Sequence, residues 1–546
     1  MAKLVTVEQM QSLEKLADKN GLSYRKMMQN AGTALAKEIQ TIAHRYYADE
    51  VSINGLVGPG NNGGDTLIAL AKLAGFNHNV TGYLLFKKID QQELIDEVIS
   101  NGGSIVFAQS DNDFKLIEEL MYSCDILLDG ILGTGFKLPL HTDLKAFLVK
   151  IKKYLEEMEI PPIIVAVDCP SGVDNSTGET SEETITADFT VCMAAVKEGL
   201  LKLPAYTHIG ELIVVDIGLT RKNSEINEIK NEVATKEVVN SYKITRPLDS
   251  HKGTFGTCLI VAGSSSYSGA ALLAGKAAYR VGAGLVTMAV PSILHAILAG
   301  HLPEATWILL PHQLGSINES ASNVLLKYVN NADSMLIGCG LGREDTTLEF
   351  MKSFLTEKAN IRTELPRIGF LHTSDQVSDG KNIKLPPLVI DADGLNLLSQ
   401  ITNWHKLLPE YTILTPHPGE MQLLTGVSKE KIQNDRLNIA RKYADEWHTI
   451  VVLKGAFTVI ASPGGDTTTI PVATSALARA GSGDVLAGMI AGFLAQGMQP
   501  YKAAITGAWY HSQAGLIAAE KLGCTDSVMA GDVINAISES ISIDLN

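Results

Sequence analysis

The sequence predicts an α/β protein with two domains, each built on a parallel β-sheet that helices cover on both faces. The chain has 546 residues, more than one ordinary domain holds, and 45% of them are hydrophobic, which is enough for large cores. Short apolar runs alternate with helical stretches, which is typical of βαβ units. The alternation stops in a polar, charged stretch after residue 220 and then restarts with different motifs. We therefore predict a first domain over residues 1–222, a linker over 223–242 and a second domain over 243–546.

The composition argues against two classes of partner. The formal net charge is -15, whereas nucleic acids and anionic membranes bind basic patches. The six cysteines form no Cys-x-x-Cys pair and no cluster with zinc spacing, so buried free thiols in a reducing compartment are the simplest account. The N-terminus lacks an apolar signal core, and no apolar stretch is long enough to span a bilayer. We expect a cytoplasmic protein that binds neither nucleic acid nor membrane.

The first half is expected to begin with helix over residues 6–37 and to continue as a sheet. Strands are expected at residues 51–57, 124–128, 163–167, 189–193 and 212–215. Three of them end in polar motifs: Gly-Pro-Gly-Asn-Asn-Gly-Gly-Asp at 58–65, Asp129 with Gly-Thr-Gly-Phe-Lys-Leu-Pro at 133–139, and Asp-Cys-Pro-Ser-Gly at 168–172. Ligands bind at the carboxyl ends of parallel strands, so the three motifs should converge in space.

These motifs predict a cation site and a carboxylate that exchanges protons. The glycine-rich loop at 61–65 lacks the Lys-Ser/Thr of a P-loop, so hydrolysis of a nucleoside triphosphate is not expected there. Asn62, Asp129 and Ser171 offer hard oxygens, which suit alkali or alkaline-earth cations, although the same residues also suit helix caps and turns. Asp168 ends a buried strand, where partial desolvation favours proton exchange; the alternative is a structural carboxylate bonded to the following N–H groups.

The second half repeats the alternation with other motifs. Strands are expected at residues 257–262, 285–290, 334–337, 388–390, 412–414 and 450–453. The motifs that follow them include Gly-Ser-Ser-Ser-Tyr-Ser-Gly-Ala at 263–270, Gly-Cys-Gly-Leu-Gly at 338–342, Thr-Pro-His-Pro-Gly-Glu at 415–420 and Lys-Gly-Ala-Phe-Thr at 454–458. Residues 353–384 are polar and irregular, and we predict a surface excursion there.

The chemical centre of the chain is predicted at Gly481, Ser482, Gly483 and Asp484. The residues that follow are small and apolar at helical spacing, so Asp484 should lie at or near a helix start. Glycines and the free N–H groups of a helix N-terminus form a hole for phosphate oxygens. A carboxylate beside that hole can take a proton from a hydroxyl while a phosphoryl group is transferred to it. The alternative is that Asp484 only caps a buried helix.

The three motifs of the first half together resemble those of the NAD(P)H-hydrate epimerase domain, over about residues 1–222. The resemblance implies a Rossmann-like sheet, catalysis by Asp168, and a potassium ion at Asn62, Asp129 and Ser171. The hydrated nicotinamide nucleotide would bind Asp168 and the residues of the first two motifs: Asn61, Asn62, Gly63, Gly64, Asp65, Gly133, Thr134, Gly135, Phe136, Lys137, Leu138 and Pro139. Thr66 departs from the family, which usually has glycine there, and is expected to narrow the freedom of the loop.

The second half resembles the NAD(P)H-hydrate dehydratase domain, which is similar to the ribokinase-like kinases, over about residues 243–546. Asp-Ser-His-Lys-Gly-Thr-Phe-Gly at 249–256 adds to the motifs above. The resemblance makes Asp484 catalytic. It assigns to the nucleotide Lys454, Gly455, Ala456, Phe457, Thr458, Thr474, Gly481, Ser482 and Gly483. It assigns to the hydrate Ala270, Gly340, His417, Pro418, Gly419 and Glu420, although a histidine between two prolines also suits a turn.

The whole chain therefore resembles the bifunctional NAD(P)H-hydrate repair enzymes. The implied reaction consumes ADP, with ATP as the alternative, together with Mg²⁺, and regenerates NADH or NADPH; related proteins form homo-oligomers. Two departures lie near the second site: Cys339 replaces the usual proline, and Ala478-Arg479-Ala480 precedes the anion hole. The rival interpretation is a ribokinase-like small-molecule kinase that carries a non-catalytic ligand-binding module.

Overall fold

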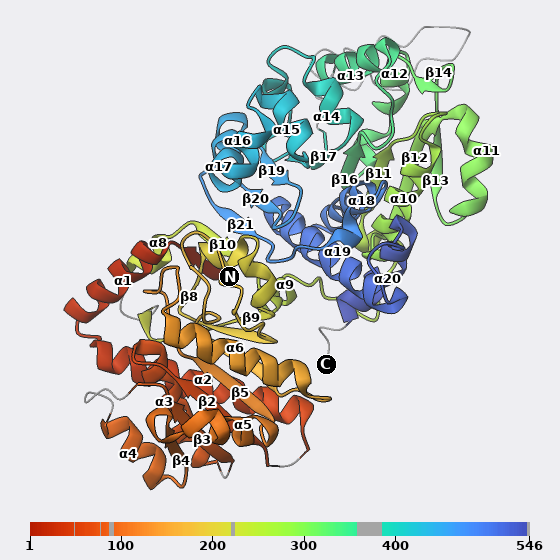
Figure 1. Ribbon diagram of the computed structural model, residues 1–546. Coiled ribbons are helices and arrows are strands. Elements are labelled where there is room, and N and C mark those ends of the chain that lie inside the picture. The colour runs from red at the N-terminus through yellow and green to blue at the C-terminus, as the bar shows by residue number, and fades with distance from the viewer. Residues whose placement is uncertain (49, 77, 87–91, 220–223, 358–384, 543–546) are drawn as a thin grey trace, which may run out of the picture. The chain divides into compact units, whose positions relative to one another are not determined.

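The computed structural model describes residues 1–48, 50–76, 78–86, 92–219, 224–357 and 385–542. The chain divides into two compact units, Ala2–Val233 and Ala234–Asn546, with Met1 assigned to the second. Both are α/β, as predicted (Figure 1). The division falls inside the stretch predicted as a linker, which also holds α8 (Ser224–Glu228), β10 (Asn231–Val233) and α9 (Lys236–Ser241).

The first unit contains a seven-stranded sheet in the order β4-β3-β2-β5-β6-β7-β9, and all six pairings are parallel. The five strands expected from the sequence are present, and two unpredicted strands, β3 and β4, extend one edge. The strands are β2 (Ser52–Val57), β3 (Asn79–Leu84), β4 (Ser104–Phe107), β5 (Ile126–Gly130), β6 (Ile163–Val167), β7 (Phe189–Met193) and β9 (Glu211–Val215).

Helices cover both faces of this sheet because successive strand residues point to opposite sides. In β5, Ile126 and Leu128 join the core beneath α2 and α3, whereas Leu127 joins the core beneath α5 and α6. The helices are α1 (Val7–Lys19), α2 (Tyr24–Tyr46), α3 (Asn61–Ala74), α4 (Gln92–Ser100), α5 (Lys115–Tyr122) and α6 (Thr142–Glu157). This arrangement leaves the carboxyl ends of the strands open to ligands.

The N-terminal region differs from the prediction of helix throughout residues 6–37. The helix is broken between α1 and α2, where Gly21 adopts a φ of +91° and Ser23 caps α2 through its side chain. A short strand, β1 (Ala2–Val5), precedes α1. It pairs parallel with β8 (Ala195–Lys197) and antiparallel with β10.

The second unit has nine strands in the order β13-β12-β11-β16-β17-β18-β19-β20-β21. Pairing is parallel from β13 to β19 and antiparallel for the last two strands. The strands are β11 (Thr257–Val261), β12 (Leu285–Pro291), β13 (Thr306–Leu310), β16 (Ser334–Ile337), β17 (Leu388–Ile390), β18 (Ile413–Leu414), β19 (Ile450–Leu453), β20 (Val459–Ala461) and β21 (Thr467–Thr469). A separate hairpin pairs β14 (His312–Gln313) with β15 (Ser316–Ile317).

Two helical layers sandwich this second sheet (Figure 1). One core lies beneath α10 (Ser268–Arg280), α18 (Ser482–Ala495), α19 (Pro500–Leu522) and α20 (Ala530–Ser542). The other lies beneath α12 (Ala321–Leu325), α13 (Asp345–Glu357), α14 (Asp393–Leu398) and α17 (Arg436–Trp447). The remaining helices are α11 (His295–Leu298), α15 (Pro418–Thr425) and α16 (Lys429–Asn434).

The predicted surface excursion at residues 353–384 is wrong at its start. Residues 353–357 belong to α13, and Phe354 is fully buried. Residues 358–384 lie outside the described residues.

Among the helices that the structure describes, none is both long and apolar enough to cross a membrane. All six cysteines are free thiols, and four of them are buried.

Candidate active sites

Three predicted oxygen donors meet at the carboxyl ends of strands in the first unit. Asp129 ends β5 and accepts hydrogen bonds from the backbone N–H of Ser171, at 2.7 Å, and from its hydroxyl. Ser171 Oγ also accepts from the N–H of Leu132, at 3.0 Å. The Asn62 amide donates to the carbonyl of Leu132 at 2.9 Å, so the same short segment links all three residues.

The predicted glycine-rich loop at 61–65 is instead the first part of α3, which begins directly after Gly60. Close packing requires its glycines, because a Cβ at Gly63 would lie 2.0 Å from the carbonyl oxygen of Gly58, and one at Gly64 would lie 2.6 Å from Met28 Sδ. The departure Thr66 is fully buried and donates to the Asn62 carbonyl at 2.7 Å. The Thr66 side chain therefore packs inside α3. The N-terminus of α3 still lies at the strand ends.

Asp168 is held by a lysine that the sequence analysis missed. Asp168 adopts a φ of +65°, accepts from the backbone N–H of Met193 at 2.8 Å and forms an ion pair with Lys197. Lys197 has no exposed surface. Burial alone would lower the pKa of its ammonium, but the charge of Asp168, the neighbouring Cys192 and Cys169, and the hydrogen bond to Asp168 together raise that pKa. A lysine directly after the apolar run 191–196 was the available signal.

Two further carboxyls face the Asp168–Lys197 pair. Burial and the neighbouring charge of Asp168 raise the pKa of Asp65, on α3, well above its usual range. Burial also raises the pKa of Glu14, on α1. The pair therefore lies beside two carboxyl groups whose pKa values are higher than those of solvent-exposed carboxyls. Raised pKa values of this kind are common in acid–base sites.

The segment 133–139 adjoins this site and is partly exposed. A Cβ at Gly133 would lie 2.6 Å from Asn62 Oδ1, so its backbone touches the oxygen cluster. Phe136 closes a tight turn by donating its N–H to the Gly133 carbonyl at 3.0 Å. The segment thus lies where a ligand bound at the strand ends would meet it.

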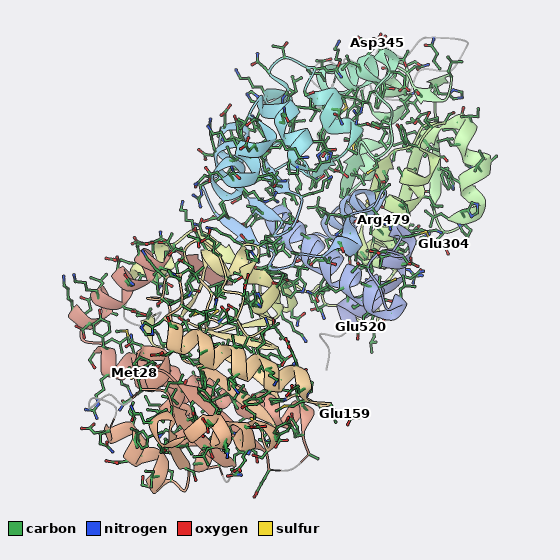
Figure 2. The ribbon with its side chains drawn as sticks, viewed as in Figure 1. Met28, Glu159, Glu304, Asp345, Arg479 and Glu520 are labelled. Atoms are coloured by element: carbon green, nitrogen blue, oxygen red, sulfur yellow. The ribbon has the colours of Figure 1, made fainter. Side chains whose placement is uncertain are left out.

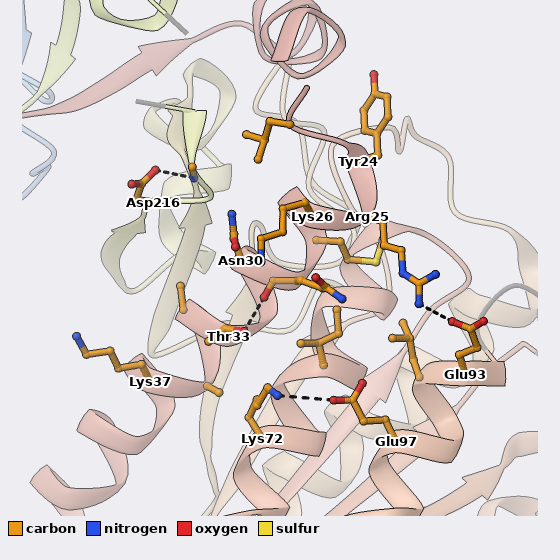
Figure 3. Close-up of a pocket in the computed structure, with 18 of the residues that line it drawn as sticks. Tyr24, Arg25, Lys26, Asn30, Thr33, Lys37, Lys72, Glu93, Glu97 and Asp216 are labelled. Carbon is orange, nitrogen blue, oxygen red and sulfur yellow. Dashed lines mark hydrogen bonds and ion pairs between the residues drawn. The ribbon is translucent and has the colours of Figure 1, made fainter. Parts of the chain in front are cut away.

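A cavity of 1590 Å³ in the same unit lies apart from this chemistry. Residues of α2, α3 and α4 line it, with the ion pairs Arg25–Glu93 at 2.6 Å and Lys72–Glu97 at 3.7 Å at its wall (Figure 3). Its lining includes none of the predicted site residues. We therefore place the candidate site at the strand ends and not in this cavity.

The predicted anion hole of the second unit is a helix start, as expected. Gly481 is the N-cap of α18 with a φ of +89°, and Asp484 lies in the first turn. The Ser482 N–H already donates to the Arg479 carbonyl at 3.3 Å. The N–H groups that point out of the first turn are therefore those of Gly483 and Asp484. A Cβ at Gly483 would lie 3.4 Å from Lys454 Nζ, so the lysine ammonium lies directly over this turn.

An ion network holds Lys454 in place. Its Nζ lies 2.6 Å from Asp391 Oδ1 and 3.7 Å from Glu420 Oε2. Asp391, which directly follows β17, also accepts from the Thr415 hydroxyl at 2.7 Å. Burial alone would lower the pKa of Lys454, but the charges of Asp391 and Glu420 raise it, so the lysine stays cationic.

Asp484 has the environment of a general base. A carboxylate oxygen of Asp484, one of Asp391 and the Cys339 sulfur all lie within 4.8 Å of one another. Burial and then the charge of Asp391 raise the pKa of Asp484 to about 6. Burial also raises the pKa of Glu420 to about 7. The departure Cys339 places a buried thiol, whose pKa is raised by burial, beside the Asp484 carboxylate.

The residues predicted to hold the hydrate surround the same strand ends. A Cβ at Gly340 would lie 2.8 Å from the Ala270 Cβ, so these two positions touch. His417 caps α15: its Nδ1 accepts from the N–H groups of Gly419, at 3.0 Å, and Glu420, at 3.1 Å. This geometry fits the interpretation of His417 as a turn residue; its ring is exposed, and its Nε2 lies 3.4 Å from Glu420 Oε1.

The loop predicted to hold the nucleotide follows β19. The Thr458 hydroxyl donates to the Gly455 carbonyl at 2.9 Å, and Phe457 adopts a φ of +55°. Thr474 Oγ1 accepts from the N–H of Ala476 at 3.2 Å. The departure Arg479, labelled in Figure 2, is exposed and donates to the Asp526 carbonyl.

Two family models match separate parts of the chain. A family model described as NAD(P)H-hydrate dehydratase matches residues 258–361 and 372–539. A second, described as YjeF-related protein N-terminus, matches residues 24–199. The dehydratase of Bacillus subtilis, described as ADP/ATP-dependent and crystallised with ATP and Mg²⁺, is 28% identical; the match covers 57% of this chain and 98% of that chain, with a TM-score of 0.45.

Relatives of similar length match along almost the whole chain. The bifunctional NAD(P)H-hydrate repair enzyme Nnr of Moorella thermoacetica is 35% identical over 97% of this chain and 95% of its own length. The enzyme of the same name from Salinibacter ruber is 32% identical over 98% of this chain and 95% of its own length. The chain therefore belongs to the family of bifunctional NAD(P)H-hydrate repair enzymes.

Proposed function

We propose that the first unit interconverts the R and S epimers of NADH and NADPH hydrates, and that the second unit dehydrates the S epimer. The phosphoryl donor is ADP rather than ATP, with Mg²⁺ accompanying the nucleotide. The observation that carries the dehydratase role is the start of α18, where free N–H groups, the Lys454 ammonium and the Asp484 carboxylate lie together. These are the groups that phosphoryl transfer to a hydroxyl requires.

The proposed dehydration has two balanced steps. Asp484 takes the proton of the hydrate hydroxyl, whose oxygen attacks the β-phosphorus of ADP, and AMP leaves. The phosphate ester then loses inorganic phosphate with its C–O electron pair, and a ring proton is lost as the double bond of NAD(P)H re-forms. Lys454 and the N–H groups of Gly483 and Asp484 stabilise the charge on the transferring phosphoryl group. A stable phosphorylated product in place of inorganic phosphate would favour the small-molecule kinase instead.

The proposed epimerisation depends on Asp168. Asp168 takes a proton from the hydroxyl on the carbon next to the ring nitrogen, and the bond from that carbon to the nitrogen opens to an aldehyde. Rotation and closure on the other face, with return of the proton, give the other epimer with no change in composition. Lys197 donates to the Asp168 carboxylate and holds it at the strand end, where it can accept this proton.

We also propose that potassium binds at Asn62, Asp129 and Ser171. The donor set is all oxygen, which suits a hard cation. Asp129 supports the proposal because its carboxylate is buried and its hydrogen-bond donors in the described chain are neutral N–H and O–H groups. A bound monovalent cation would offset this buried negative charge.

The resemblance also implies a homo-oligomer. Light scattering of the purified protein measures its oligomeric state.

Replacing K⁺ by Li⁺ at constant ionic strength is expected to slow epimer exchange by about tenfold, because the smaller ion cannot satisfy the same oxygens. K⁺ should also raise the unfolding midpoint of the wild-type protein, since it binds only the folded state. The measurement is epimer exchange by NMR beside thermal unfolding, with Asp129→Asn as the variant that should lose both K⁺ effects. Equal exchange and equal midpoints in K⁺ and Li⁺ would contradict the site.

The dehydratase rate is expected to fall as the pH drops through about 6. Asp484 must be ionised to accept a proton, and burial raises its pKa to about 6, so acid removes the active form by about tenfold per pH unit below that value. The measurement is kcat for the S epimer between pH 5 and about 8. A profile that stays flat down to pH 5 would contradict the role of Asp484 as base.

A further inference from the structure

A buried histidine contacts the first turn of α18 from the side of α19. The His511 Nε2 atom lies 3.2 Å from Ser482 Oγ. The two residues are only 7% and 5% exposed, respectively, so water competes little for this hydrogen bond. Ser482 lies between the N-cap Gly481 and the two residues whose N–H groups face the phosphoryl site. His511 thus contacts the anion hole indirectly, through the Ser482 side chain.

His511 is neutral in the working range of pH. Burial, with a smaller contribution from the Lys454 charge, lowers its pKa to about 4. A neutral imidazole offers one donor and one acceptor nitrogen, so it can hold the Ser482 hydroxyl without adding charge beside the phosphates. It is therefore not suited to exchange protons with the substrate, and its contribution has to be geometric.

The first turn of α18 needs such a contact. Its N-cap is Gly481, which has no side chain to bond the first N–H groups and makes no capping hydrogen bond. Gly483 adds a second residue with wide backbone freedom. The bond between His511 and Ser482 is the side-chain contact that fixes the turn between these two glycines.

We propose that His511 is a positioning residue for the dehydratase. Through Ser482 it fixes the first turn of α18, so that the N–H groups of Gly483 and Asp484 and the Asp484 carboxylate face the transferring phosphoryl group. The inference rests on the proposed function of this site and adds to it a residue that touches neither substrate.

A double-mutant cycle tests the proposal with the full-length protein. His511→Phe and Ser482→Ala should each lower kcat for dehydration by about tenfold, with KM for the hydrate and for ADP nearly unchanged, because a displaced turn weakens the transition state more than binding. The double variant should be no slower than His511→Phe, since that variant already removes the bond to the Ser482 hydroxyl and the hydrogen bond to the Ser482 backbone. His511→Gln, which keeps a hydrogen-bonding group, should recover part of the rate. Ser512→Ala is the matched control on α19, because its hydroxyl donates within that helix, to the Trp509 carbonyl at 2.7 Å.

Epimer exchange by the same molecules reports whether each variant is folded and active in its first unit. Additive losses in the double variant, or wild-type kcat with only a lowered unfolding temperature, would overturn the role of His511. If His511→Phe does not fold, kcat and KM of Ser482→Ala and His511→Gln test the role of His511 in its place. If Asp484→Asn is inactive while the His511 and Ser482 variants are fully active, the inference fails and the proposed function stands. If Asp484→Asn is itself fully active, the proposed function of this site fails.

Discussion

Asp484→Asn is expected to lower dehydration of the S hydrate by about a thousandfold and to leave folding and epimer exchange unchanged. The amide keeps the shape of the carboxylate but cannot accept the hydroxyl proton during phosphoryl transfer. Removing the charge should not harm the fold, because burial and the nearby Asp391 already disfavour the ionised form. The measurement is absorbance of the reduced nicotinamide as the hydrate is consumed.

Asp345→Asn is the matched control for this variant. Asp345 also lies in the first turn of a helix of the second unit, but it is exposed (labelled in Figure 2). Its replacement tests whether the loss of a carboxylate at a helix N-terminus is enough to change the rate. Equal activity of the two variants would remove Asp484 from the mechanism.

Asp168→Asn is expected to slow epimer exchange by about a thousandfold and also to destabilise the first unit by about 3–5 kcal/mol. The rate falls because the proton acceptor is lost. Stability falls because Lys197, which has no exposed surface, keeps a buried charge without its partner. Lys197→Met should also destabilise the first unit, because Asp168 then keeps a buried charge without its partner. It should slow epimer exchange as well, since Asp168 then lies near two other carboxyls, Asp65 and Glu14.

The double variant Asp168→Asn with Lys197→Met separates the two effects. Removing both charges should restore most of the lost stability, because no unpaired charge remains buried. It should not restore epimer exchange. Chemical unfolding and exchange rates of the four proteins are the measurements, with Lys153→Met as an exposed lysine control. A double variant as unstable as either single variant, or one that still exchanges epimers, would contradict this account of the pair.

The strands and the helix start at Asp484 were predictable because each depends on local pattern. Apolar runs of three to seven residues that end in Gly, Asp or Ser located β2, β5 and β6 in the first unit and β11, β16 and β17 in the second. β3 and β4 were missed: β3 carries Asn, Thr and Gly, and β4 is followed by Ala108 and not by the Gly, Asp or Ser that marks the other strand ends. Their place at the sheet edge is set by packing on α3 and α4 rather than by sequence period.

The errors at residues 61–65 and at Lys197 share a cause. Two adjacent glycines predict a loop, yet contacts with the Gly58 carbonyl and with Met28, distant in sequence, fold them into α3. Lys197 was missed because its partner, Asp168, lies 29 residues earlier in the chain. His511 bonds Ser482 across the same separation of 29 residues. Motifs located the strand ends, whereas the residues that support them depend on tertiary contacts.

The most direct test of the central claim is recovery of the reduced nicotinamide from a mixture of R and S NADH hydrates by the wild-type protein, with ADP or ATP supplied. The account predicts complete recovery with ADP, faster than spontaneous epimer exchange, and one inorganic phosphate released per NADH formed. Recovery that stops at the S fraction would contradict the epimerase role of the first unit. No recovery with either nucleotide, or accumulation of a phosphorylated product, would contradict the dehydratase role of the second.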